Sequence, residues 1–203
     1  MKSYSQANQD IWALEYLGFP KSGYYLDIGA MDGLTSSNTY LMEKEFGWNG
    51  ICVECHPLHL KEIVKHRTCK IVKRALHNTN AAMNFDFRKS TLSTLFEQNG
   101  TVVKTISFDK LIEEFNIPTV IDYVSLDIEG AEYLALTTFP FDTHIIKTMT
   151  VEHDSYQRGP KMKNDIKELL ISKDYILAEE DVTCPDSGNL PFEDWYVHKN
   201  YIK

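Results

Sequence analysis

The sequence predicts one α/β domain with a mostly parallel central sheet and helices on both faces of that sheet. Three observations support this prediction. Short apolar segments alternate with amphipathic ones, several apolar segments end in an acid or a glycine, and no repeat or linker divides the chain. The 203 residues, 43% of them hydrophobic, suit a single packed core. We therefore expect one domain over residues 1–203, with residues 1–22 as an N-terminal helical extension.

The first half of the chain contains three segments that are typical of buried parallel strands, because each is short and apolar. A predicted helix at 9–19 precedes them and stops at Pro20 and Gly23. Pro57 stands where the first turn of a later helix would begin. We expect strands at 24–30, 50–54 and 69–76, separated by helices at 38–46 and 58–64.

The second half continues the alternation of strands and helices. Residues 83–88 and 102–106 are weaker strand candidates around a polar loop, and residues 108–115 form a clear amphipathic helix. Two further apolar strands end in acids, and each precedes a helix. We expect strands at 121–130 and 145–154, helices at 131–138 and 161–172, and late strands at 175–179 and 195–198.

Composition and charge exclude several classes of protein. The formal net charge of −8 gives no general electrostatic footprint for nucleic acid, which makes such a partner unlikely without excluding it. The chain starts without the pattern of a signal peptide, and no apolar run is long enough for a membrane span. Four unevenly spaced cysteines do not predict a disulfide scaffold, so we expect a cytoplasmic protein. Six cations between Lys61 and Arg74 indicate a solvated face or, as a minority interpretation, a patch for a phosphorylated or nucleic-acid acceptor.

The segment DIGAMDG, residues 27–33, follows the first predicted strand. Gly29 and Gly33 permit a turn in which a ligand approaches the backbone closely, because glycine lacks a Cβ and tolerates positive φ. A nicotinamide site would require G-x-G-x-x-G, and Met31 stands where the middle glycine belongs. The motif therefore disfavours an oxidoreductase.

Carboxylates recur at the ends of the predicted strands. Glu54 ends the second strand, where it can accept hydrogen bonds from both hydroxyls of a ribose. Asp127 and Glu152 stand at the ends of later strands. Ligands of open parallel sheets bind beyond the carboxyl ends of the strands, so we expect these acids to lie near one site. No P-loop accompanies them, which favours a ligand with a cationic amino-acid end over a triphosphate.

Together these features resemble the class I S-adenosylmethionine-dependent methyltransferases, which have a Rossmann-like fold, and more narrowly the FkbM family. The resemblance covers nearly all of the chain. The segments that carry it are Ser5-Gln6, Gln9-Asp10, YLDIGAMDG, Ser37-Asn38-Thr39-Tyr40, GWNGICVECHP, SLDIEGAEY, VEHD and DWYVH. It implies that residues 1–22 cover the cofactor cleft.

The resemblance also implies roles for single residues. Asp27, Gly29 and Asn38 would line the methionine end of S-adenosylmethionine, Glu54 would hold the ribose, and Ala75 with Leu76 would lie beside the adenine. Glu132 is interpreted instead as a cap of the following helix. The expected cofactor-binding residues are Asp27, Gly29, Ala30, Gly33, Asn38, Glu54, Ala75, Leu76 and Asp127, and the expected catalytic residues are Asp127, Glu129, Glu152 and His153.

The function that this implies is O-methylation of a hydroxyl on a small molecule or glycan. A module that binds S-adenosylmethionine without turnover and a methyltransferase acting on nucleic-acid ribose are the alternatives. Cys52 and Cys55 have the spacing of a zinc pair, but no second pair follows, so no metal site is predicted. We expect the loops at 89–101 and 155–163 to select the acceptor. Their sequences contain no motif that predicts which acceptor binds, and the sequence predicts no oligomeric state.

Overall fold

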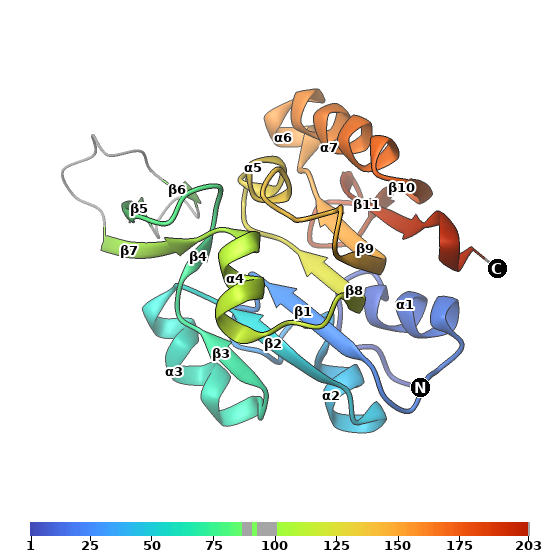
Figure 1. Cartoon of the computed structure of the whole chain (residues 1–203), viewed down its shortest axis with the longest axis horizontal. Helices are drawn as coiled ribbons and strands as arrows, with labels where there is room; N and C mark the ends of the chain where they lie inside the picture. The colour runs from blue at the N-terminus through green and yellow to red at the C-terminus, as the bar shows by residue number, and fades with distance from the viewer. Residues whose placement is uncertain (87–90, 93–100, 203) are drawn as a thin grey trace.

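The computed structural model describes residues 1–86, 91–92 and 101–202 (Figure 1). A seven-stranded sheet runs through the molecule in the order β10-β11-β9-β8-β1-β2-β3. The five strands from β9 to β3 are parallel, whereas β11 is antiparallel to both of its neighbours. The strands are β1 (Tyr24–Ile28), β2 (Asn49–Val53), β3 (Lys70–Val72), β8 (Val120–Leu126), β9 (Ile145–Glu152), β10 (Tyr175–Thr183) and β11 (Pro191–His198). The predicted mixed α/β fold is confirmed.

Helices cover both faces of the sheet, as the sequence predicts (Figure 1). Successive β1 residues point to opposite faces, so Tyr25 and Leu26 belong to two separate apolar clusters. The cluster that includes Tyr25 packs against α1 (Gln9–Leu17), α2 (Tyr40–Phe46) and α3 (Pro57–His66). The cluster that includes Leu26 packs against α4 (Phe108–Phe115), α5 (Glu132–Leu136) and α7 (Lys161–Ser172).

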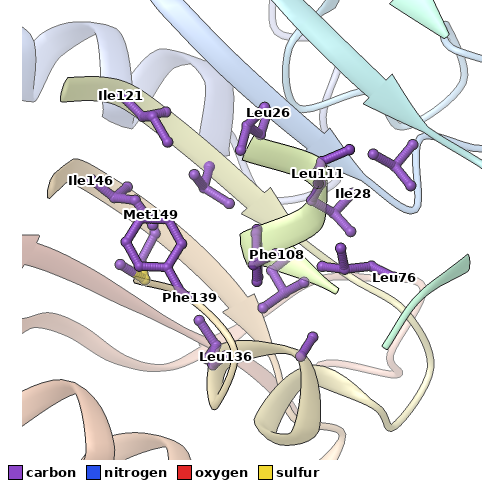
Figure 2. Close-up of a cluster of buried hydrophobic side chains, with 14 of the residues drawn as sticks. Leu26, Ile28, Leu76, Phe108, Leu111, Ile121, Leu136, Phe139, Ile146 and Met149 are labelled. Carbon is purple, nitrogen blue, oxygen red and sulfur yellow. The ribbon is translucent and has the colours of Figure 1, made fainter. Parts of the chain in front are cut away.

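The larger cluster forms the core between the sheet and the α4, α5 and α7 layer (Figure 2). Residues of β1, β8 and β9 meet the aromatic rings of Phe108 and Phe139, whose centroids lie 5.4 Å apart in an edge-to-face arrangement. This packing fixes the central strands, and with them the strand ends that carry the site. Figure 2 labels Leu26, Ile28, Leu76, Phe108, Leu111, Ile121, Leu136, Phe139, Ile146 and Met149.

Ile121 tests whether β8 is the buried centre of this core. The side chain is fully buried and pairs in register with Ile146 of β9. Ile121→Val removes one methylene, and we expect the free energy of unfolding in urea to fall by about 0.5 to 1.5 kcal/mol. Val120→Thr changes the neighbouring exposed position and should stay within about 0.5 kcal/mol. Equal losses in the two variants would contradict a central position of β8.

The segment expected as one strand over residues 69–76 is divided between two sheets, which corrects the prediction. It forms β3 in the main sheet and β4 (Ala75–Leu76) in a second sheet of order β4-β7-β5-β6. The polar pair Lys73 and Arg74 interrupts the apolar pattern at the division, and Arg74 forms an ion pair with Glu114. The other strands of the second sheet are β5 (Ala82–Asp86), β6 (Thr91–Leu92) and β7 (Thr101–Ile106).

Other boundaries differ from the sequence predictions for local reasons. The strand expected at 121–130 ends at Leu126, because Glu129 and Gly130 adopt positive φ and form a turn. The expected loop at 155–163 contains the short helix α6 (Ser155–Arg158). Residues 87 and 88 of the expected strand at 83–88, and most of the expected loop at 89–101, lie outside the described residues. Within the described ranges, no helix has the length and apolar character required to cross a bilayer.

Candidate functional site

The turn after β1 lies against the end of β8. Gly29 has a φ of +88°, and a Cβ at this position would stand 1.7 Å from the carbonyl oxygen of Asp127. The backbone N–H groups of Gly29 and Ala30 both donate to the carbonyl oxygen of Val53. A glycine is therefore required at position 29, both by its backbone conformation and by the close approach of β8.

The sequence suggests that Gly33 allows a ligand to approach the backbone. In the structure, the Arg67 side chain packs against this glycine instead. A Cβ here would lie 2.6 Å from Cγ of Arg67, whose Nη1 donates to the Gly33 carbonyl oxygen. The same Nη1 lies 3.3 Å from Oδ2 of Asp27, which also accepts a 2.5 Å hydrogen bond from Thr39. The carboxylate of Asp27 is thus held inside the protein, and neither it nor Gly33 lines the pocket described below.

Arg67 is a buried hub that the sequence analysis missed. Its guanidinium bonds the Glu43 carboxylate at 2.7 Å, the Tyr25 hydroxyl at 2.8 Å and the Thr39 hydroxyl at 2.7 Å. The sequence predicted a solvated face for the six cations between Lys61 and Arg74. This prediction is wrong for Arg67, because its side chain is fully buried. Arg67 therefore connects β1, α2 and the loop that follows the glycine turn.

A pocket opens at the carboxyl ends of β1, β2 and β8. It brings together Gly29, Glu54, Asp127 and Glu129, which the sequence analysis singled out from separate segments. Ala75 and Leu76 of β4 line it as predicted, and Phe85 of the second sheet also lines it. Met31, His56 and His59 also line the pocket, and the sequence analysis did not predict this position for them. The further lining residues are Val53, Cys55, Arg74 and Ile128.

Glu54 is oriented by the turn that follows β2. Its Oε1 accepts the backbone N–H groups of Cys55 at 2.7 Å and His56 at 2.6 Å. Its Oε2 lies 3.6 Å from Nδ1 of His59. One carboxylate oxygen is therefore fixed by the backbone, and the other is left to accept hydrogen bonds from a ligand.

Asn38, an expected cofactor-binding residue, does not line this pocket. Its Nδ2 donates to the Ser125 hydroxyl at 2.8 Å. Its Oδ1 is buried and has no hydrogen-bond partner within the described residues. A buried acceptor without a partner is costly, so this oxygen fits a ligand that carries a hydrogen-bond donor.

Asp127 and Glu152 place two carboxyl groups in hydrogen-bond contact at the ends of β8 and β9. Burial first, and then the negative charge of Glu129, raise the pKa of Asp127 to about 7, against the opposing effect of its hydrogen bond with Glu152. Burial and the charge of Asp127 also raise the pKa of Glu152. Both carboxyl groups therefore hold a proton more strongly than ordinary carboxyl groups do, and the pKa of Asp127 approaches the range that suits a general base at neutral pH.

Glu129 and Glu132 follow Asp127 but face different surroundings. Glu132 is fully buried and accepts the backbone N–H groups of Ile128 and Gly130, so it stabilises the turn before α5. Glu129 lines the pocket and lies 3.3 Å from the guanidinium of Arg158. Carboxylate oxygens of Glu129, Glu152 and Asp154 converge within 4.8 Å. Arg158 already forms ion pairs with Glu129 and Asp154, and we assign no ion to this group.

His153 does not lie in the pocket, although the sequence suggested a catalytic role. Its side chain is 1% exposed, and its Nδ1 accepts the backbone N–H of Ser155. Its Nε2 lies 3.4 Å from Oδ1 of Asp194, which also lies 3.8 Å from the ammonium group of Lys163. Both ring nitrogens therefore face protein groups, and the catalytic role of His153 stays a prediction that this geometry does not support.

Glu193 of β11 is a buried acid that the sequence analysis missed. It pairs in register with Glu152, accepts the indole N–H of Trp195 at 2.7 Å and contacts the side chain of Gln9. Burial raises its pKa to about 8. The sequence analysis missed Glu193 because a glutamate in a strand is expected to face solvent unless the neighbouring strand is known.

The strand order, the single antiparallel strand beside the edge and the pocket at the strand ends define a class I methyltransferase fold. The sequence profile of the Methyltransferase FkbM domain matches residues 27–177. The chain belongs to this family. The sequence matches none of the curated proteins with which it was compared.

Solved structures show the same fold. The methyltransferase FkbM from Methylobacillus flagellatus KT has a TM-score of 0.62 and 14% identity, over 89% of this chain and 44% of that one. The N-terminal domain of human METTL16 in complex with SAH has a TM-score of 0.54 and 15% identity, over 98% and 72%. A putative rRNA methylase from Clostridium thermocellum has 0.52 and 11%, over 97% and 99%. The chain thus spans less than half of the first of these proteins.

Proposed function

We propose that the protein transfers the methyl group of S-adenosylmethionine to a hydroxyl group of a small molecule or glycan. The observation that carries this proposal is the pocket in which the glycine turn, Glu54 and Asp127 meet, in a chain of a methyltransferase family. A cytoplasmic location belongs to the same proposal. The net charge of −8 weighs against a nucleic-acid acceptor.

The residues present fit this cofactor at three points. The unbonded oxygen of Glu54 suits the ribose hydroxyls, and the apolar wall of Ala75 and Leu76 suits the adenine. The unpartnered Oδ1 of Asn38 suits the ammonium group of the methionine end. When bound, the cofactor supplies an activated methyl group on a sulfonium. The chain's own residues must then position the acceptor oxygen and accept its proton.

We assign to Asp127 the role of the base that accepts the proton of the acceptor hydroxyl. It lines the pocket next to Gly29, and its raised pKa makes it a better base than an ordinary aspartate. Glu152 is in contact with it and shares the proton. Glu129 and Arg158 flank the same side, where they would orient the acceptor.

The N-terminal extension, residues 1–22, is proposed to cover the cofactor cleft. Two contacts support this position: the side chain of Gln9 bonds Glu193, and the ring of Trp12 lies 4.8 Å from that of Trp195. The extension therefore packs on the strand that contributes Glu193, close to Asp127.

Glu54→Gln tests the cofactor assignment. The amide keeps an oxygen for the N–H groups of Cys55 and His56 but replaces the free carboxylate oxygen with a donor. We expect the binding free energy of S-adenosylmethionine, measured by calorimetry, to weaken by about 1.5 to 3 kcal/mol, the scale of hydrogen bonds to a charged group.

The matched control is Glu62→Gln, which changes an exposed acid on α3 and should leave the affinity unchanged. Wild-type affinity in Glu54→Gln would remove the ribose assignment. A wild-type protein that binds no S-adenosylmethionine would overturn the proposed function itself. A protein that binds it but forms no S-adenosylhomocysteine with any hydroxyl acceptor would favour a binding module without turnover.

A further inference from the structure

Asp127, Glu152 and Glu193 form a row of carboxyl groups across three neighbouring strands. Glu193 stands directly opposite Glu152 in the register of β11 and β9. Asp127 follows the pair of Leu126 and Val151, so it stands at the level of Glu152 on the β8 side. Residues in register on adjacent strands point to the same face of a sheet. We call these three residues the carboxyl row.

The carboxyl row has no counter-charge of its own. Glu193 is 3% exposed, and its side chain bonds the neutral indole of Trp195 and the neutral amide of Gln9. Oε2 of Glu152 is buried and has no hydrogen-bond partner in the part of the chain that the structure describes. Within the described residues, no ion pair involves the row. The two nearby cations pair with other acids: Arg158 with Glu129 and Asp154, and Lys163 with Asp194. Like charges at this spacing cannot all ionise without a cation.

The surroundings of the row add negative rather than positive charge. Each element packed against it contributes at least one polar group. These groups are Glu129 and Glu132 after β8, Asp154 after β9, Asp194 on β11, Gln9 on α1, Arg158 on α6 and Lys163 on α7. The two cations are already paired with acids outside the row.

We propose that the carboxyl row holds protons in the free protein and releases them to solvent when S-adenosylmethionine binds. This inference rests on the proposed function. Asp127 connects the row to the pocket, so a sulfonium cation there would favour the ionised carboxylates. Glu193 is then a positioning residue, because it acts through Asp127 and Glu152. The pKa values of about 7 for Asp127 and about 8 for Glu193 agree with this.

Calorimetry in two buffers of different ionisation enthalpy, phosphate and Tris, measures the protons released on binding. At pH about 7.5 we expect the wild-type protein to release on the order of half a proton to one proton per S-adenosylmethionine. Since the free protein binds more protons than the complex, the affinity should also rise with pH. S-adenosylhomocysteine has the same framework without the sulfonium charge and should release fewer protons.

Glu193→Gln keeps the oxygen that accepts from Trp195 but removes one titrating group. It should bind S-adenosylmethionine and release less than half as many protons as wild type. Glu62→Gln, at an exposed acid of α3 paired with Lys65, should release as many as wild type. If Glu193→Gln does not fold, Asp127→Asn provides the same comparison.

Two results would overturn the inference while leaving the proposed function intact. One is binding of S-adenosylmethionine by wild type with no proton release. The other is equal release with S-adenosylmethionine and S-adenosylhomocysteine. Undiminished release in Glu193→Gln would remove Glu193 from the row. Failure of wild type to bind S-adenosylmethionine at all would overturn both proposals.

Discussion

Asp127→Asn is expected to lower the rate of methyl transfer by about 10²- to 10⁴-fold while S-adenosylmethionine still binds. The amide keeps the shape of the side chain but cannot accept the proton of the acceptor hydroxyl. In the wild-type protein, the carboxylate must be ionised to act, and its pKa is about 7. The wild-type kcat/KM for S-adenosylmethionine, which reports the free protein, should therefore rise with pH up to about 7 and then level off, and the variant should lose this dependence. The wild-type kcat should level off at a lower pH, because the bound cofactor favours the ionised carboxylate.

The measurement is the formation of S-adenosylhomocysteine with a panel of small hydroxyl compounds and glycans, on the acceptor that gives the highest wild-type rate. Asp165→Asn, at an exposed acid of α7 that pairs with Lys161, is the control and should keep the wild-type rate. Turnover of Asp127→Asn within about threefold of wild type would move the role to Glu152 or show that no side-chain base is needed.

Arg67→Met is expected to lower the free energy of unfolding by about 3 to 5 kcal/mol. The substitution keeps an apolar chain of similar length but leaves the carboxylate of Asp27 buried without its cation, and it leaves Glu43 with only its ion pair to Lys44. Breaking one partner of a buried ion pair costs far more than the pair contributes, because the remaining charge is not solvated. Urea unfolding with an unchanged m-value would measure the loss.

Arg74→Met is the matched control, because Arg74 and Glu114 form a bidentate pair in which both side chains are partly exposed. Its effect should be much smaller than that of Arg67→Met. If Arg67→Met does not fold, Thr39→Val removes the two hydrogen bonds that the Thr39 hydroxyl makes with Asp27 and Arg67 and should destabilise the protein measurably. Similar effects of Arg67→Met and Arg74→Met would contradict a central role for the buried hub.

The strands and helices that depend on local pattern were predictable from the sequence. The bounds of α4 and α7 agree with the amphipathic segments at 108–115 and 161–172. The division of residues 69–76 between two sheets was not predictable, because it depends on pairing with β2 on one side and β7 on the other. Local periodicity contains no information about such distant partners.

The site was predictable where a residue follows a strand end directly. Glu54 and Asp127 were placed at the pocket for this reason. Arg67 and Glu193 were missed because a charged residue is read as solvent-facing unless its buried partners are known. Asp27 shows the converse. Its position at a strand end predicted a ligand contact, but its carboxylate accepts hydrogen bonds from Arg67 and Thr39 inside the protein.

The second sheet gives the protein two frameworks with different constraints. Leu76 and Phe85 bring the four-stranded sheet to one wall of the pocket, whereas Glu54 and Asp127 belong to the ends of the seven-stranded sheet. Leu76 also packs in the main core with residues of β1 and β8, whereas Phe85 is not part of that core cluster, so a substitution of Phe85 can reshape the wall with less effect on the strands that precede the acids. The shape of the pocket at β5 can thus vary separately from the acids at the ends of β2 and β8.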